Sequence, residues 1–316
     1  MHRRKTKFAK RVAHVAQAIE TRGVRATYEL HDRLGANRRS RHRFASSQPA
    51  LDPAQQDILE RVRNYGFAVV PFGELFPDPA RWQEIEAAAD AFIAESEAGL
   101  AAEAEGRESG LRRTAAKDFV VRRNAWGVTI PLDDPWLSLG LDPRMLDLAN
   151  TYLGLWSKLE YVDLWYTPAA DAADRKASQR WHRDFNDRLL LKAFLYLSDV
   201  DAQAGPFEYV PESFPGGRLG DLWPWSPGGS DAYPPDEAFQ AKLEGEPIQT
   251  FTGSRGTMIF CNTAGFHRGG FSTGRERVLA TWTYASPAAL KALSERNYTA
   301  SGDVASLEPP QQHAVA

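Results

Sequence analysis

The feature that most constrains this chain is a succession of short strands without intervening helices, between about residues 159 and 287. The segments are rich in aromatic and β-branched residues and are separated by Gly, Pro and Asp. They span residues 159–167, 188–197, 207–211, 248–252, 257–262 and 278–285. Strands at this density predict an antiparallel sandwich or jelly roll.

The segment before these strands is predicted to be mainly helical. Asp52 followed by Pro53 is a favourable helix start, because Asp caps free N–H groups and Pro suits the first helical position. The expected elements are helices at 53–64, 79–98 and 143–153, a strand at 67–71 and a mobile acidic stretch at 98–110. The expected architecture is therefore mainly β with flanking helices.

Charge divides the 316 residues into a basic arm and an acidic body. Residues 1–43 carry 13 Lys or Arg and three Asp or Glu, a balance of +10, so the remainder carries −13 to give the overall −3. We expect a basic, partly helical arm at 1–48, with a helix at 8–19, a folded domain at 49–300 and a disordered tail at 301–316. The arm is compatible with docking on the body, a weak contact with an anionic surface, a solubilising role or an organelle transit peptide.

Bulk composition indicates an ordinary globular protein in a reducing compartment. Hydrophobic residues make up 43% of the chain and charged residues 25%. The single cysteine, Cys261, excludes an internal disulfide, and the hydropathy pattern predicts neither a membrane span nor a secretory signal. We therefore expect a cytoplasmic location, and the sequence leaves the oligomeric state open.

Candidate chemistry centres on histidine. Four of the seven histidines lie in the basic arm and one in the tail, so the body holds only His182 and His267. His182 stands in a Trp-His-Arg-Asp motif, and residues i and i+2 of an extended chain point to the same side, which places Asp184 next to it. His267 follows an apolar strand and precedes two glycines that leave space beside it. Each motif alone is also compatible with a structural role.

Together His182, Asp184 and His267 form a candidate metal-ligand set. Two histidines and one carboxylate on one face of a metal are the ligands of non-haem iron(II) oxygenases, with the opposite face open for substrate and O2. Zinc accepts the same ligands, so a metal-dependent hydrolase is an alternative. A third hypothesis is a catalytically inactive jelly-roll binding protein.

An arginine after the second histidine favours iron. Arg277 opens the strand that follows His267, and a guanidinium binds a carboxylate through two parallel hydrogen bonds. The co-substrate 2-oxoglutarate chelates iron through its 2-oxo acid end and leaves a distal carboxylate that needs such a partner. Arg275, two residues earlier on the same face, is the rival for this role. The structural alternative is an arginine that lies exposed at the strand edge and binds no co-substrate.

Residues 60–286 resemble the phytanoyl-CoA dioxygenase-type branch of the 2-oxoglutarate/Fe(II) oxygenases, which includes ectoine hydroxylase-like enzymes. The matching blocks, in the same order, are WHRD (181–184), LLLKAFLYLSDVDAQAGPFEYVPES (189–213), GTMIFCNTAGFHRGG (256–270) and GRERVLATWTY (274–284). The resemblance implies a double-stranded β-helix, a cupin-like jelly roll, with Fe(II) on His182, Asp184 and His267 and 2-oxoglutarate on Arg277. It also implies a dioxygenase that hydroxylates a small-molecule substrate with O2 and releases succinate and CO2.

Two details qualify this resemblance. Asp184 keeps the carboxylate that related halogenases replace with a small residue, so hydroxylation is the expected outcome. The segment Pro-Glu-Ser-Phe at 211–214 stands where the family often has Pro-Gly-Ser-His, so the substrate contacts are expected to differ.

Further candidates come from the strand at 188–197 and from the insert at 216–236. Lys192 and Phe194 share one face of the strand, where they would contact 2-oxoglutarate or substrate, or else serve as a rim lysine and a core phenylalanine. Within the insert, Trp223, Trp225 and Tyr233 would form a substrate lid or pack the insert down. No nucleic-acid, CoA or phosphate signature is present, and the substrate stays open.

Overall fold

The computed structural model describes residue 32 and residues 35–114, 117–124, 127–170, 175–185, 187–223, 232–289 and 296–316. The helix expected at 8–19, most of the basic arm and Trp225 of the insert lie outside these residues.

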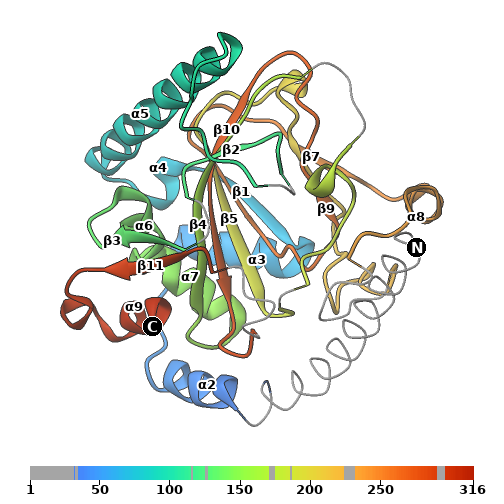
Figure 1. The fold of residues 1–316 in the computed structure, drawn as a ribbon. Coiled ribbons are helices and arrows are strands. Elements are labelled where there is room, and N and C mark those ends of the chain that lie inside the picture. Colours follow the sequence, from blue (N-terminus) through green and yellow to red (C-terminus); the bar gives the residue numbers. More distant parts are fainter. Residues whose placement is uncertain are drawn as a thin grey trace, which may run out of the picture.

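A six-stranded sheet forms the centre of the described part of the chain (Figure 1). Its strands in spatial order are β1 (Phe67–Pro71), β8 (Thr257–Cys261), β5 (Leu190–Tyr196), β10 (Arg277–Ala285), β4 (Lys158–Thr167) and β2 (Val121–Arg122). All neighbours in this sheet are antiparallel. The strands predicted at 67–71, 159–167, 188–197, 257–262 and 278–285 therefore lie in one sheet, and β2 is an edge strand that the sequence did not indicate.

A second, smaller sheet lies across from the large one. Its strands in spatial order are β7 (Gln249–Phe251), β6 (Phe207–Tyr209) and β9 (His267–Arg268). A parallel pair at the side of the molecule consists of β3 (Val128–Pro131) and β11 (Tyr298–Ser301). The two antiparallel sheets give the predicted jelly-roll architecture, mainly β with flanking helices, although the sheets are not joined into a closed barrel.

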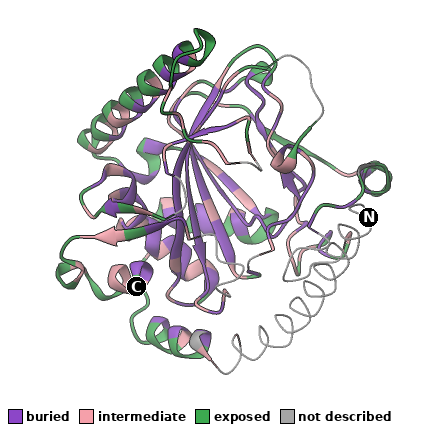
Figure 2. Ribbon diagram, viewed as in Figure 1, coloured by how far each residue is buried: buried purple, intermediate pink, exposed green. Residues whose placement is uncertain are grey.

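Both faces of the large sheet are buried (Figure 2). On one face, alternate residues such as Leu195 and Trp282 pack beneath the helices in the main hydrophobic core. On the other face, Phe194 and Leu279 pack against Phe207 of the small sheet. Because side chains alternate along a strand, each strand contributes to both layers. The layer between the sheets is where a cavity can form.

Helices cover the outer face of the large sheet, with α3 against β1, α6 against β4 and α7 against β5. The described helices are α2 (Ala36–Ser46), α3 (Pro53–Tyr65), α4 (Phe72–Leu75), α5 (Pro79–Ala104), α6 (Pro135–Gly140), α7 (Pro143–Leu153), α8 (Asp236–Leu243) and α9 (Pro309–Val315). Asp52 caps α3 in a capping box, and Gly66 ends it in the left-handed region with φ of 88°. The predicted starts of α3, α5 and α7 are confirmed.

Two expectations near the ends of elements were wrong, and the described part of the basic arm follows one of the alternatives that the sequence left open. The stretch expected to be mobile after residue 98 continues α5 to Ala104. Part of the basic arm forms α2, which packs on the body through Asn37, whose amide donates to Ser286 Oγ at 2.9 Å. The tail expected to be disordered contains η3 (Val304–Ser306) and α9, because Lys158 of β4 donates to the His313 carbonyl at 2.7 Å and Ala314 is fully buried.

Within the described residues, no helix combines the length and apolar character that crossing a membrane requires.

Candidate metal centre

Two distant segments are held together by their backbones at the edge of the small sheet. The His182 N–H donates to the His267 carbonyl and the His267 N–H donates to the His182 carbonyl, both at 3.0 Å. Two residues further on, the Asp184 N–H donates to the Thr263 carbonyl at 2.8 Å. This pairing keeps the segment around His182 extended, so its i and i+2 side chains project to one side, as the sequence pattern predicted.

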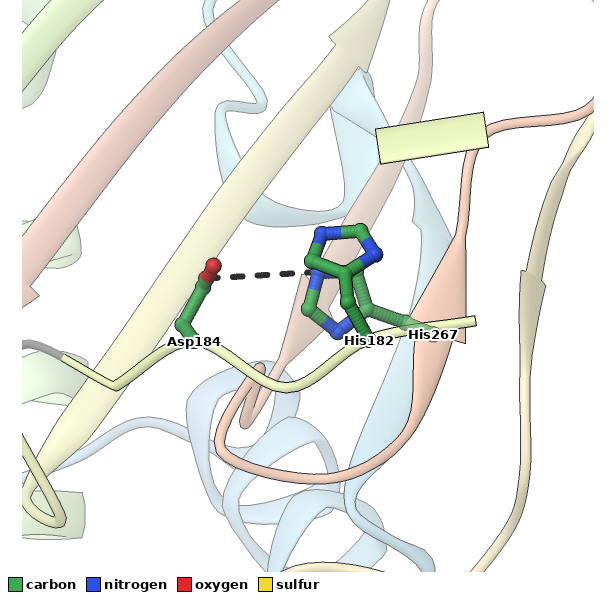
Figure 3. Close-up of side chains that lie close together, drawn as sticks. All are labelled: His182, Asp184 and His267. Atoms are coloured by element: carbon green, nitrogen blue, oxygen red, sulfur yellow. Dashed lines mark ion pairs between the residues drawn. The ribbon is translucent and has the colours of Figure 1, made fainter. Parts of the chain in front are cut away.

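The structure brings the three predicted ligands together (Figure 3). One ligand atom from each of His182, Asp184 and His267 lies within 4.8 Å of the others, and all three residues are buried. The two imidazole centroids are 4.1 Å apart, and His267 Nε2 is 4.0 Å from Asp184 Oδ2. The set therefore has the spacing of groups that can share one ion.

The hydrogen bonds of both imidazoles suit metal binding. His182 Nδ1 lies 2.9 Å from the Arg180 carbonyl, and His267 Nδ1 lies 3.0 Å from the Gly265 carbonyl. A carbonyl accepts only, so each Nδ1 carries the proton and each Nε2 keeps its lone pair. Burial lowers the pKa of both rings, which keeps them neutral near pH 7. The donor set fits a divalent cation: two neutral imidazole nitrogens and one carboxylate.

A lysine holds the carboxylate of this set. Lys192 Nζ forms an ion pair with Asp184 Oδ2 at 2.7 Å, and both side chains are almost completely buried. Burial is the largest single effect and opposes ionisation of Asp184, but the charge and hydrogen bond of Lys192 together with the two histidines outweigh it, so the pKa of Asp184 lies below its usual range. The carboxylate is therefore ionised, as a metal ligand must be.

Arg183, between two of the ligands, points away from them and anchors the insert. Its guanidinium donates to the carbonyls of Ser213 at 2.7 Å, Gly220 at 2.6 Å and Trp223 at 2.7 Å. It also lies over the Phe266 ring at 4.1 Å. Burial lowers the pKa of Arg183 to about 10, so the group still carries its charge near pH 7. One arginine thus connects both ligand segments to the start of the insert.

The three ligands line a cavity of about 370 Å³ between the two sheets. Lys192 and Phe194 line it too, as their shared strand face predicted, so neither is a simple rim or core residue. The volume is at the small end of the range of about 300–1,000 Å³ for ligand sites. The cavity therefore suits small molecules.

Arg277 and Arg275, the two candidates for binding 2-oxoglutarate, have different surroundings in the structure. Arg277 is buried and lines the cavity, with Nη1 donating to the Gly205 carbonyl. Its Nε is buried and has no hydrogen-bond partner among the described residues. Arg275 is half exposed and pairs with Asp201 at 3.1 Å, outside this cavity. Of the two, Arg277 alone is placed to meet a cavity ligand.

Tyr233 is the insert residue that reaches the site. Its ring stacks on the His182 imidazole, with centroids 5.1 Å apart and an interplanar angle of 10°, and it is 38% exposed. Trp223 instead packs with Phe239 and Phe266 in a separate hydrophobic cluster. In the described part of the insert, Tyr233 therefore lines the cavity and Trp223 packs against the body, and the lid stays a prediction.

A group of residues on and near β4 and β2, at one wall of the cavity, was not predicted from the sequence. Arg122 Nε donates to Asp163 Oδ2 at 2.6 Å, and Tyr161 OH donates to the same oxygen at 2.9 Å. Lys117 Nζ lies 4.2 Å from the centroid of the Trp165 ring. Period-two alternation of Tyr161, Asp163 and Trp165 along a predicted strand was the available signal for their common face. Nothing comparable marks Lys117 or Arg122.

Comparison with solved structures supports the fold. The non-heme α-ketoglutarate-dependent epimerase SnoN from nogalamycin biosynthesis is similar over 77% of this chain and 89% of its own, with 20% identity and a TM-score of 0.50. SnoN in complex with Fe3+, α-ketoglutarate and nogalamycin RO matches with 19% identity and a TM-score of 0.51, over 77% and 90% of the two chains.

A second enzyme gives the same result. EctD from S. alaskensis with 2-oxoglutarate and 5-hydroxyectoine matches 77% of this chain and 80% of its own, with 17% identity and a TM-score of 0.50. No protein-family model and no curated protein sequence matches the chain. At these identities the comparisons show the fold, and the chain has the jelly-roll fold of these enzymes.

Proposed function

We propose that this protein is an Fe(II)- and 2-oxoglutarate-dependent dioxygenase of the phytanoyl-CoA dioxygenase-like type, which hydroxylates a C–H bond of a small molecule. The observation that carries the proposal is one cavity lined by His182, Asp184, His267 and the buried guanidinium of Arg277. The solved structures of SnoN with Fe3+ and α-ketoglutarate and of EctD with 2-oxoglutarate support the choice of metal and co-substrate.

His182, Asp184 and His267 would hold the metal. Bound Fe(II) supplies the redox chemistry that couples oxidative decarboxylation of 2-oxoglutarate to oxygen insertion: substrate, O2 and 2-oxoglutarate give hydroxylated substrate, succinate and CO2. A ligand set of two histidines and one carboxylate would leave one face of the metal open to the co-substrate and O2. Asp184 matters for the outcome, because a carboxylate ligand takes the position that a halide would need.

Arg277 would bind the distal carboxylate of 2-oxoglutarate. Its buried Nε lacks a partner among the described residues, and leaving a charged donor unpaired is costly. A carboxylate would satisfy this donor with a charge-assisted hydrogen bond. Phe194 and Leu279 line the same part of the sheet face and would pack against the methylene groups. Lys192 would orient Asp184 through their ion pair.

A zinc hydrolase and an inactive binding protein are the rival functions. Neither function would supply a hydrogen-bond acceptor for the buried Arg277 Nε, whereas a dicarboxylate co-substrate would. The aromatic cavity between the sheets also limits water, which the oxidising chemistry requires.

The test is anaerobic addition of Fe(II) and 2-oxoglutarate, followed by absorption spectroscopy. We expect the weak metal-to-ligand charge-transfer band of a bound 2-oxo acid. Arg277→Gln should raise the 2-oxoglutarate concentration for half-saturation by at least about tenfold, the effect of losing a charge-assisted contact. Arg275→Gln, which changes the exposed neighbour, should leave it unchanged. A wild-type protein without this band, or a metal-dependent activity insensitive to O2 and 2-oxoglutarate, would overturn the proposal.

A further inference from the structure

We propose that the cavity wall formed by Lys117, Arg122 and Trp165 binds a carboxylate group of the substrate, and that the substrate is a small carboxylic acid with a flat apolar body. This inference rests on the proposed function, because it divides one cavity between 2-oxoglutarate and substrate. It adds a substrate class, which neither the fold nor the metal ligands specify.

The wall lies apart from the arginine assigned to 2-oxoglutarate. Arg277 belongs to β10, whereas Arg122 belongs to the edge strand β2, and β4 separates the two strands. Trp165 of β4 pairs with Arg122 on one side and with Leu279 of β10 on the other. Arg277 and Arg122 therefore approach the cavity from different strands, with β4 between them.

Arg122 is held in a fixed orientation by a buried network. Its Nε donates to Asp163 Oδ2 and its Nη2 donates to Tyr161 OH. Asp163 Oδ1 accepts from the Asn124 and Leu164 N–H groups at 2.8 and 2.9 Å. A buried ion pair adds little net stability, because its desolvation cost offsets the attraction between the charges. The position of Arg122 on a cavity wall therefore favours a binding role for this residue. A guanidinium preorganised in this way loses little entropy when it binds an anion.

Lys117 adds a second cation to the same wall. Its Nζ lies 4.2 Å from the Trp165 ring centroid, within the range of a cation–π contact, and it lines the cavity. Lys117 lines the same cavity as His182 and His267, so its ammonium group can contact a substrate bound beside the metal site.

The charge and shape of the lining define the ligand. Among the described lining residues, Lys117, Arg122, Lys192 and Arg277 are cationic and Asp184 is acidic. Asp163, which lies behind the wall, pairs with Arg122, and the cavity still keeps an excess of positive charge. This balance favours an anionic substrate over a cationic one. Aromatic rings form a large part of the remaining wall and match a flat apolar body; they are Phe119, Tyr161, Trp165, Phe185, Phe194, Tyr196, Phe207 and Tyr233. A volume of about 370 Å³ shared with 2-oxoglutarate restricts this body to a few carbon atoms or one ring.

The test uses benzoate, phenylacetate and 3-phenylpropanoate, each paired with its neutral amide, and phenyl phosphate as a second anion. Binding is measured by calorimetry without O2 on protein saturated with Fe(II) and 2-oxoglutarate. The charge-transfer band reports throughout that 2-oxoglutarate stays in place. We expect at least one carboxylate to bind at least tenfold more tightly than its amide.

Variants of the wall residues test whether the preference for a carboxylate over its amide comes from this wall. Lys117→Met should reduce the carboxylate-to-amide ratio at least threefold, and so should the double variant Arg122→Met/Asp163→Asn, which avoids an unpaired buried charge. Arg123→Met is the matched control, because Arg123 pairs with Asp134 at 2.6 Å outside this cavity, and it should keep the wild-type ratio.

Three results would overturn the inference while the band is intact: no carboxylate preference, a preference that both variants retain, or tighter binding of phenyl phosphate than of every carboxylate. Absence of the band counts against the proposed function instead. In that case, calorimetric titration of the metal-free protein with the same carboxylates and amides tests carboxylate binding by the wall independently.

Discussion

His182 and His267 exchange backbone hydrogen bonds in both directions at 3.0 Å, although they come from segments far apart in the chain. Their imidazole centroids lie 4.1 Å apart as a result, and the i−2 carbonyls hold both Nδ1 atoms. Backbone pairing thus determines ring position, and local carbonyls determine ring orientation. Because many proteins with different functions share this fold, the placement of these two side chains says more about function than the fold does.

The first prediction concerns metal-dependent stability. Fe(II), or Ni(II) as an air-stable substitute, should raise the melting temperature of the wild type, because a ligand that binds the folded state stabilises it. The gain is about 2.7 kcal/mol at a metal concentration about 100 times Kd. His182→Ala and His267→Ala should each lose this increase in differential scanning fluorimetry. His42→Ala, an exposed histidine of α2, is the control, and an equal metal shift in all four proteins would contradict the assignment.

The sequence predicted those parts of the fold whose causes are local. Asp52 and Pro53 begin α3 through capping, and period-two alternation gave the face of β5 that carries Lys192 and Phe194. The three candidate ligands were also named from the sequence. An extended His-x-Asp places the side chains of His182 and Asp184 together by strand geometry, and His267 is the other histidine of the predicted body.

Features with non-local causes were missed. The helix α9 is held by Lys158 and Arg296, which bind carbonyls at its C-terminal end, and no local signal reports such contacts. The strand β2 has only two residues, so it carries almost no propensity signal, yet it delivers Arg122 to the cavity. The choice between Arg275 and Arg277 likewise required the register of β10 against β4.

A second prediction concerns Arg183 and the insert. Arg183→Met would remove the donor from three carbonyls, those of Ser213, Gly220 and Trp223. At about 1 kcal/mol for each buried acceptor, the free energy of unfolding should fall by about 3 kcal/mol. Metal affinity should also fall, because both neighbours of Arg183 in the chain are ligands.

Urea denaturation and the metal-dependent melting shift measure the two effects of Arg183→Met. Arg39→Met, at an exposed position of α2, is the control and should change neither quantity appreciably. Wild-type stability in the Arg183 variant would show that the insert is held by other contacts.

The third prediction concerns the close backbone contact between Gly270 and Gly205, whose carbonyl accepts a hydrogen bond from Arg277. A Cβ on Gly270 would lie 2.4 Å from the Gly205 carbonyl carbon and 2.4 Å from the Pro206 oxygen, both backbone atoms. Gly270→Ala should therefore separate these segments and lower the free energy of unfolding by about 1–3 kcal/mol. It should also weaken 2-oxoglutarate binding, because the Gly205 carbonyl accepts from Arg277.

Chemical denaturation and the charge-transfer titration measure these two effects. Gly73→Ala is the control, since a Cβ there meets nothing within 4 Å. If Gly270→Ala weakened stability without changing 2-oxoglutarate affinity, the backbone contact would not position Arg277.

The last prediction concerns acid stability at the interface of α2, β4 and α9. Arg43 Nη1 lies 3.3 Å from His313 Nδ1, so Nδ1 accepts, and the opposite Nε2–H donates to the Trp156 carbonyl at 3.1 Å. Burial, followed by the charges of Lys158 and Arg43, lowers the pKa of His313 to about 4. In the unfolded chain it titrates near its ordinary value of about 6.5.

Between these two values the unfolded chain binds a proton that the folded protein does not bind. The stability associated with neutral His313 is therefore fully present above about pH 6.5 and is lost as the pH falls towards 4. After a discount for the partly exposed ring, its size is about 1 kcal/mol. In urea denaturation at a series of pH values, His313→Gln should flatten the fall in unfolding free energy over this window. His42→Gln should keep the wild-type slope, and a His313 variant with that same slope would place the acid sensitivity elsewhere.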